Sequence, residues 1–118
     1  MTKKGPPASN EQRVAVDLNN PVFLKSWFSL EDKNESARIL NTLEKVGQLT
    51  WTQVYRDAGL KWERITHPPV TPPAGIDAVY SIRVTQARRA VVFRERNLMR
   101  FLLIAEDHDA TYPKGKRK

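Results

Sequence analysis

Apolar residues in the first half of the chain recur at the three- and four-residue spacing of α-helices. Residues 13–18 alternate loosely between apolar and polar and favour a short edge strand. Asn20 followed by Pro21 is typical of a helix start, because Asn caps the first turn and Pro fits the first helical position. The apolar stripe expected on this helix consists of Val22, Phe23, Trp27 and Leu30.

Two further helices are predicted, one after Ser29 and one after Thr50. Each of these residues is followed three positions later by a side chain that suits a capping box. We expect the second helix to run to Val46 and to end at Gly47, and Gly59 to end the third. The side chains expected to face the core are Ile39, Leu40, Leu43 and Val46 on the second helix and Trp51, Val54 and Tyr55 on the third.

The pattern then changes to the two-residue alternation of strands. Residues 61–66 look extended, with Trp62 in the core, and residues 67–75 contain four prolines, which predicts an exposed loop. Three strands joined by hairpin-length links are expected at 80–85, 90–95 and 98–104. The last is apolar on both faces apart from Arg100, which favours a central position in the sheet.

These segments predict an α+β fold, with N-terminal helices packed on one face of a C-terminal antiparallel sheet. The 118 residues are expected to form one domain. We place this domain at residues 13–112, between a disordered tail at 1–12 and a basic tail at 113–118.

Composition excludes several classes of protein. No apolar run approaches the ~18 residues that a membrane span needs, and the N-terminus lacks the apolar core of a secretory signal. A cytoplasmic protein without a membrane partner is therefore expected. The chain has no cysteine and two histidines, so neither a disulfide nor a metal site is expected. It also has no glycine-rich phosphate loop, so no small-molecule cofactor is expected.

The charge balance points to polyanionic partners. Lys and Arg number 20 against 13 Asp and Glu, which gives a net charge of +7. Residues 76–118 hold ten basic and five acidic residues, so this third of the chain carries +5 of that charge. Most of the predicted sheet's cations are arginines, whose planar fork binds phosphate with two hydrogen bonds.

Arg83 is the arginine whose position is easiest to predict. On a strand, Ser81, Arg83 and Thr85 share one face, opposite Tyr80, Ile82 and Val84. If the second group packs on the helices, Arg83 stands on the open face, where it could hold an RNA backbone. The alternative is that such arginines are merely solvated.

The segment 106–112 gathers acids, an imidazole and a phenol directly after the last predicted strand. His108 lies between Asp107 and Asp109, whose negative charge favours the imidazolium, so it could act as a general acid or base. Tyr112 could stack on a base. The alternative is that an aspartate caps a turn and Tyr112 covers the sheet edge.

The order and spacing of these segments resemble the RelE/ParE superfamily of type II toxin–antitoxin toxins. The resemblance covers about residues 21–112 and is strongest over 80–112. It is carried by residues 80–84, 89–93, 99–104 and 107–112. It implies an antiparallel sheet with helices on one side and, for many members, a ribosome-dependent mRNA endonuclease neutralised by a cognate antitoxin.

The resemblance also implies site residues. Arg83 and Arg89 match the family's basic strand positions, although Arg88 is equally near, and His108 with Tyr112 resembles its terminal pair. Ser81, Asp107, Asp109, the insertion 67–75 and the extra helix 50–58 depart from the pattern.

The implied mechanism is metal-independent RNA cleavage by a ribosome-associated enzyme that inhibits translation. The RNA 2′-hydroxyl attacks the neighbouring phosphate, while Arg83 and Arg89 stabilise the developing charge. His108 serves as acid or base, and Tyr112 stacks on a base. The residues expected to bind RNA are Arg88, Arg94, Arg100, Lys114 and Lys116. The expected partners are the antitoxin, mRNA and the ribosome.

Two other readings stay open. One is a non-catalytic protein of RelE/ParE fold that inhibits DNA gyrase, as the ParE branch does, or that simply binds nucleic acid through its collective charge. The other is an interaction protein whose basic face receives an acidic partner helix. A steep salt dependence with little sensitivity to single mutations would favour collective binding over catalysis.

Overall fold

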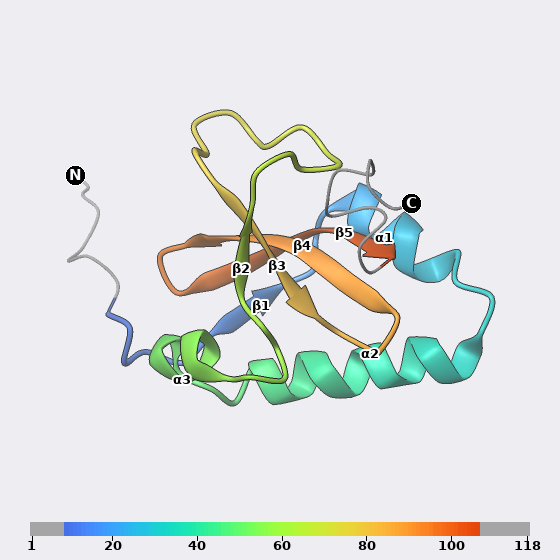
Figure 1. Cartoon of the computed structure of the whole chain (residues 1–118), viewed down its shortest axis with the longest axis horizontal. Helices are drawn as coiled ribbons and strands as arrows, with labels where there is room; N and C mark the ends of the chain where they lie inside the picture. Colours follow the sequence, from blue (N-terminus) through green and yellow to red (C-terminus); the bar gives the residue numbers. More distant parts are fainter. Residues whose placement is uncertain (1–8, 107–118) are drawn as a thin grey trace, which may run out of the picture.

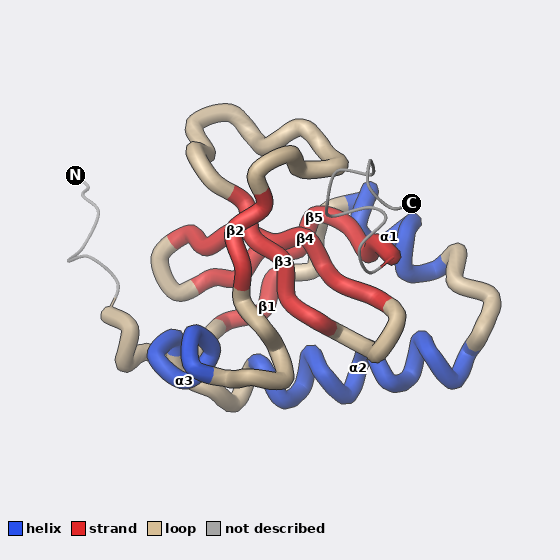
Figure 2. The backbone as a smooth tube through the Cα atoms, viewed as in Figure 1, coloured by secondary structure: helices blue, strands red, loops and turns tan. Residues whose placement is uncertain are grey.

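The computed structural model describes residues 9–106 and has helices and a single sheet in two layers (Figures 1 and 2). The helices are α1 (Pro21–Phe28), α2 (Lys33–Val46) and α3 (Trp51–Arg56). The strands are β1 (Ala15–Asp17), β2 (Glu63–Ile65), β3 (Val79–Arg83), β4 (Arg88–Glu95) and β5 (Leu98–Glu106). The predicted α+β class is confirmed.

The five strands lie in the order β1-β5-β4-β3-β2. Strands β2 to β5 form the predicted antiparallel meander, but β1 pairs with β5 in parallel. The predicted C-terminal antiparallel sheet is therefore confirmed, and β1 from the N-terminal part adds a parallel strand at its edge. The predicted central position of β5 is confirmed, since it lies between β1 and β4.

The helix ends follow local hydrogen bonding. The Asn20 carboxamide accepts from the Val22 N–H at 2.8 Å, which confirms the predicted start of α1. The N-cap of α2 is Asp32, not Ser29, because the Asp32 carboxylate accepts from the Asn34 N–H at 2.9 Å.

The third helix also departs from its predicted end. The capping box of Thr50 and Gln53 is present as predicted. However, α3 ends at Arg56, and its C-cap is Asp57. The helix therefore ends before Gly59, which we expected to terminate it.

The main core lies between the helices and one face of the sheet. Its buried side chains include Phe23, Ile39, Leu43, Val46, Trp51 and Val54 from the helices and Ile82, Ala90, Val92, Met99 and Phe101 from the sheet. Three expected core residues are instead exposed: Val22 at 54%, Leu40 at 47% and Tyr55 at 41%. Each lies at the flank of its helix's apolar stripe, where the sheet no longer covers it.

A second, smaller core covers part of the opposite face of the sheet. Val70 and Ile76 of the proline-rich loop pack against Val79, Val91 and Phe93. In Figure 1 this loop lies across the sheet from α2 and α3. Most of residues 67–75 are exposed, as predicted, but Val70 and the neighbouring Ile76 cover strand residues that would otherwise face water.

Residues 9–12, which we expected to be part of a disordered tail, form hydrogen bonds with the start of α3. The Asn10 carbonyl accepts from the Thr52 N–H at 2.9 Å, and the Gln12 carbonyl accepts from the Trp51 N–H at 3.2 Å. Residues 1–8 and the basic tail at 113–118 lie outside the described residues. Within 9–106, no helix is long and apolar enough to cross a membrane.

Candidate nucleic-acid interface

Arg83 lies at the end of β3, on the face that alternation predicts. Its neighbours Ile82 and Val84 are buried in the core beneath the helices, so Arg83 belongs to the opposite face. The Arg83 side chain is partly exposed, and its Nη1 donates to the Gln86 carbonyl at 3.0 Å. This bond orients the guanidinium beside the β3–β4 turn.

Arg83 and Lys45 line one shallow pocket of about 210 Å³. Gly59, Leu60 and Gln86 of the β3–β4 turn also line this open pocket. Lys45 pairs with Asp57 at 3.0 Å, and its side chain remains 48% exposed. The Arg83 guanidinium suits a phosphate group, whereas Asp57 offsets the charge of Lys45. Lys45 was missed from the sequence because it lies on α2, far along the chain from the arginine-rich strands.

Arg89 is buried in the sheet and is fully engaged by protein groups. Its Nε donates to the Ser81 hydroxyl at 2.9 Å, and its Nη2 donates to the Lys61 carbonyl at 2.7 Å. Glu63 lies 3.9 Å from the same Nη2. The Arg89 side chain is 1% exposed, so this geometry argues against the expected phosphate contact and gives Arg89 a structural role.

Arg88 points to the helix side of the sheet. Its Nε donates to the Glu35 carboxylate at 3.0 Å, and Glu106 lies 3.9 Å from its Nη1. Thr85 donates to the same Glu35 carboxylate at 3.3 Å. Arg88 thus fastens the β3–β4 hairpin to α2. A signal for this pair was present in the sequence, since Glu35 lies four residues before Ile39 on the helix's buried stripe.

Arg94 also lies on the helix side. Its guanidinium stacks over the Trp51 ring at 4.4 Å from the centroid. Its Nη1 donates to the Asn10 carboxamide at 2.6 Å and to the Tyr55 hydroxyl at 3.0 Å. This arginine connects the N-terminal segment, α3 and the β4–β5 hairpin, so its contacts are with protein.

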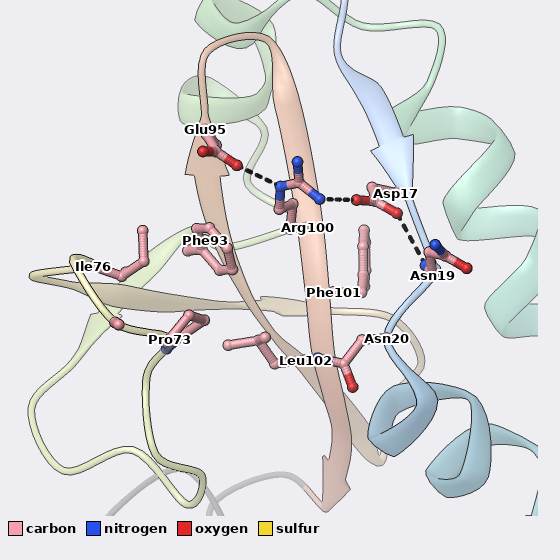
Figure 3. A pocket seen from close by; sticks show the side chains of 11 residues that line it. Asp17, Asn19, Asn20, Pro73, Ile76, Phe93, Glu95, Arg100, Phe101 and Leu102 are labelled. Atoms are coloured by element: carbon pink, nitrogen blue, oxygen red, sulfur yellow. Dashed lines mark hydrogen bonds and ion pairs between the residues drawn. The ribbon is translucent and has the colours of Figure 1, made fainter.

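Arg100 lies on the face away from the helices and bridges two carboxylates (Figure 3). Its Nε donates to Glu95 at 2.6 Å and its Nη1 donates to Asp17, so the side chain links β4, β5 and β1. It lines a pocket of about 360 Å³ whose floor includes Phe93 and Leu102. The paired acids neutralise the positive charge that the sequence placed here.

These pairings change the electrostatic picture of the sheet. Of the described sheet arginines expected to contact RNA, Arg88, Arg89 and Arg100 each face a carboxylate, and Arg94 is held by an aromatic ring and neutral oxygens. Glu95 and Glu106 come from the same segment as these arginines, whereas Glu35, Glu63 and Asp17 come from segments earlier in the chain. Composition does not encode those partners.

Four expected site residues, His108, Tyr112, Lys114 and Lys116, lie outside the described residues. Strand β5 ends at Glu106, two residues before His108, and there it pairs in register with Arg88. In register, Arg83 lies across from Arg89, and Arg89 lies across from Ala105. The end of β5 is therefore at the same end of the sheet as Arg83.

Sequence reasoning also missed an aromatic pocket. Tyr55, Trp62 and Tyr80 line a cavity of about 550 Å³ together with Arg94 and Asp77. These aromatic residues come from three separate segments of the chain, so no local sequence motif predicts the pocket. Across residues 9–106, no group of three or more His, Asp or Glu side chains could hold a metal ion.

Comparison with known proteins gives little further guidance. No protein-family model matches the sequence, and no curated protein matches it. Among solved structures, the chain is similar to the YoeB dimer from Staphylococcus aureus, with 17% identity and a TM-score of 0.48. That match covers 82% of this chain and 99% of the other. At these values the likeness supports no conclusion about activity.

Proposed function

We propose that this protein is the toxin of a type II toxin–antitoxin system and acts as a ribosome-associated mRNA endoribonuclease. The observation that carries the proposal is the pocket shared by Arg83 and Lys45, at the end of the sheet from which the chain continues toward His108. The sequence resemblance to RelE/ParE toxins over residues 80–112 supports the same reading. The net charge of +7 suits an RNA substrate.

The proposed chemistry needs no metal. The RNA 2′-oxygen attacks the neighbouring phosphorus, and the bond from phosphorus to the 5′-oxygen breaks. His108 acts as general acid or base for the protons that leave the 2′-hydroxyl and join the 5′-oxygen. Arg83 stabilises the negative charge on the phosphoryl oxygens. Tyr112 stacks on a base.

Arg89 contributes indirectly to this proposed site. It bonds to both the hydroxyl and the carbonyl of Ser81, which shares a strand face with Arg83. In the proposal Arg89 therefore holds the backbone of β3 in place, and Arg83 contacts the phosphate. The proposed partners are mRNA, the ribosome and a cognate antitoxin that covers part of this surface.

Primer extension on a reporter mRNA tests the proposal, with purified protein and with or without translating ribosomes. We expect discrete cuts that require ribosomes and that fall at least 100-fold in Arg83→Ala, as for the loss of one preorganised charge-stabilising group, roughly 10²–10³ in rate. Arg64→Ala is the matched control, because Arg64 is an exposed arginine on the neighbouring strand β2. Equal cutting by both variants would contradict the proposed role of Arg83.

A non-catalytic function has one observation in its favour. Carboxylates pair with Arg88, Arg89 and Arg100. Fewer arginines are therefore available to contact phosphate than we expected from the sequence. A DNA gyrase supercoiling assay addresses this second candidate. Inhibition of supercoiling together with an uncut reporter mRNA would favour it over the endoribonuclease.

A further inference from the structure

The aromatic pocket lies where α3, the approach to β2 and the start of β3 meet. Tyr55, Trp62 and Tyr80 supply its aromatic lining, and residues 75–78 close one side. Its volume of about 550 Å³ falls within the ~300–1,000 Å³ typical of ligand pockets. The pocket is separate from the one that holds Arg83, and the two share no lining residue.

The aromatic rings of this pocket are held in fixed positions. Trp62 stacks on Tyr80 with ring centroids 4.6 Å apart and planes inclined by 20°. Tyr55 meets Trp62 edge-on at 5.4 Å, and the Tyr55 hydroxyl accepts from Arg94 Nη1 at 3.0 Å. Arg94 is in turn stacked over Trp51. The rings are therefore organised before any ligand arrives, which lowers the entropic cost of binding.

The exposure of these rings leaves apolar surface for a ligand. Tyr55 is 41% exposed, and Trp62 and Tyr80 are half-buried. Flat heterocycles stack on such surfaces, and stacking is the usual way in which proteins hold unpaired RNA bases.

Asp77 supplies the polar group that gives the pocket a chemical preference. It is exposed, it lines the same cavity, and it has no ion pair or hydrogen bond with another residue of the described range 9–106. An ionised carboxylate only accepts hydrogen bonds, and its two oxygens suit a pair of adjacent donors. Among RNA bases, guanine carries two adjacent N–H donors on its Watson–Crick edge.

We infer that this pocket binds a guanine base, stacked on the Tyr55 side and hydrogen-bonded to Asp77. The guanine belongs to single-stranded RNA or to a free guanine nucleotide, since both offer the same ring. The RNA source rests on the proposed function, whereas the pocket's preference for guanine does not depend on RNA cleavage.

Fluorescence anisotropy with labelled pentanucleotides tests this inference. The probes are 2′-O-methyl uridine strands with one central guanosine or adenosine, which cannot be cleaved through a 2′-hydroxyl. A second arm measures the binding of GMP and AMP by calorimetry. We expect at least a tenfold preference for guanine over adenine in one or both arms. Preference in the RNA arm alone identifies a strand as the ligand, and preference in both arms identifies the base itself.

Point variants distinguish binding in the pocket from general attraction to the protein's positive charge. Asp77→Asn is expected to abolish the guanine preference, and Tyr55→Leu to weaken guanosine binding about tenfold, within the range for one stacked base. Glu44→Gln and Phe28→Leu are the matched controls, because both replace exposed side chains on other helices. Circular dichroism melts confirm folding. Tyr55→Phe keeps the ring but loses the hydroxyl bond to Arg94, so it should bind guanosine more tightly than Tyr55→Leu.

Two results would overturn the inference. One is equal affinity for guanine and adenine in both arms. The other is an unchanged preference in Asp77→Asn, measured in a variant that melts like the wild type. Neither bears on the cleavage proposal, which is read separately by primer extension with Arg83→Ala, so failure of one claim leaves the other standing.

Discussion

The buried guanidinium of Arg89 holds three segments together: β4, β3 through Ser81, and the turn before β2 through the Lys61 carbonyl. Buried charges are stable only when they are paired and hydrogen-bonded, and removal of one partner leaves the others unsatisfied. Residue type and strand order placed Arg89 near the start of a predicted strand but assigned it to no face of the sheet. They could not predict its burial, because the covering residues come from the turn at Lys61.

Replacement of Arg89 tests this structural role. Arg89→Met keeps much of the side-chain length but leaves the Lys61 carbonyl and Ser81 without their donor, so we expect the free energy of unfolding to fall by about 2–4 kcal/mol. Urea denaturation measures this change. The control Arg64→Ala, at an exposed site, should change stability by less than about 0.5 kcal/mol. A loss no larger than that of the control would refute the structural role.

Asp57 makes a pH-dependent contribution to stability. Partial burial raises the pKa of its carboxyl, but the hydrogen bond and charge of Lys45 and the N–H groups of Leu60 and Gly59 outweigh this effect. The pKa therefore lies below its ordinary value of 3.8. A lowered pKa stabilises the folded state above the unfolded value, and this stability is lost as the pH falls through the folded pKa.

The comparison of wild type with Asp57→Asn across pH tests this linkage. The variant should be less stable near pH 7, because it loses the ion pair with Lys45 at 3.0 Å. The difference should begin to shrink once the pH drops below the ordinary pKa of 3.8, where Asp57 of the unfolded chain takes up its proton, and should be lost as the pH falls through the lower folded pKa. Thermal melts in matched buffers measure it. A stability difference between wild type and variant that grows as the pH falls would contradict this linkage.

At the scale of elements, caps and turns explain most of what could be predicted. Thr50 with Gln53 and Asn20 with Pro21 carry strong local signals, and both helix starts are confirmed. Asp32 was harder to identify as a cap because Ser29 offers an equally good local pattern. Ser29 is instead the C-cap of α1, where its N–H donates to the Lys25 carbonyl at 3.0 Å, and Asp32 is left to cap α2.

The β4–β5 hairpin contains a testable strain. Arg96 has a φ of 60°, in the left-handed region where a side chain costs free energy and glycine does not. Arg96→Gly should therefore raise the free energy of unfolding by about 0.5–1 kcal/mol. The bond from Arg94 Nε to the Arg96 carbonyl at 2.6 Å uses the backbone and is retained.

The matched control for this prediction is Arg96→Ala, which removes the same side chain but keeps the strain. Chemical denaturation of both variants should show stabilisation for glycine and little change for alanine. Equal stability of the two would show that the turn carries no strain that glycine relieves.

At the scale of the whole molecule, the chain builds a sheet with a core on each side. The helix-side core was predicted from periodicity, because the helices' buried stripes face alternating strand residues such as Ile82 and Val92. The second core was not predicted, since prolines in the loop indicated exposure and masked the apolar Val70 and Ile76. Folding thus places part of a loop on a face that was expected to be open.

The residues of the candidate site likewise divide into those that local sequence patterns predict and those that only the three-dimensional fold brings together. Arg83 was found from the sequence because strand alternation is a local rule, and Ile82 and Val84 confirm its face. Lys45 and the aromatic pocket were missed because their members meet only in three dimensions. The carboxylates that pair with Arg88 and Arg100 were likewise present in the composition but not assignable to partners.

The most direct test of the central claim is the chemistry of the cut RNA ends. If the 2′-hydroxyl attacks the phosphate, mass spectrometry should find a 2′,3′-cyclic phosphate or its opened form on one fragment and a 5′-hydroxyl on the other. Both products should be lost in Arg83→Ala and His108→Ala while Arg64→Ala still makes them. Fragments that carry a 5′-phosphate and a 3′-hydroxyl, or an RNA left intact beside translating ribosomes, would contradict the account.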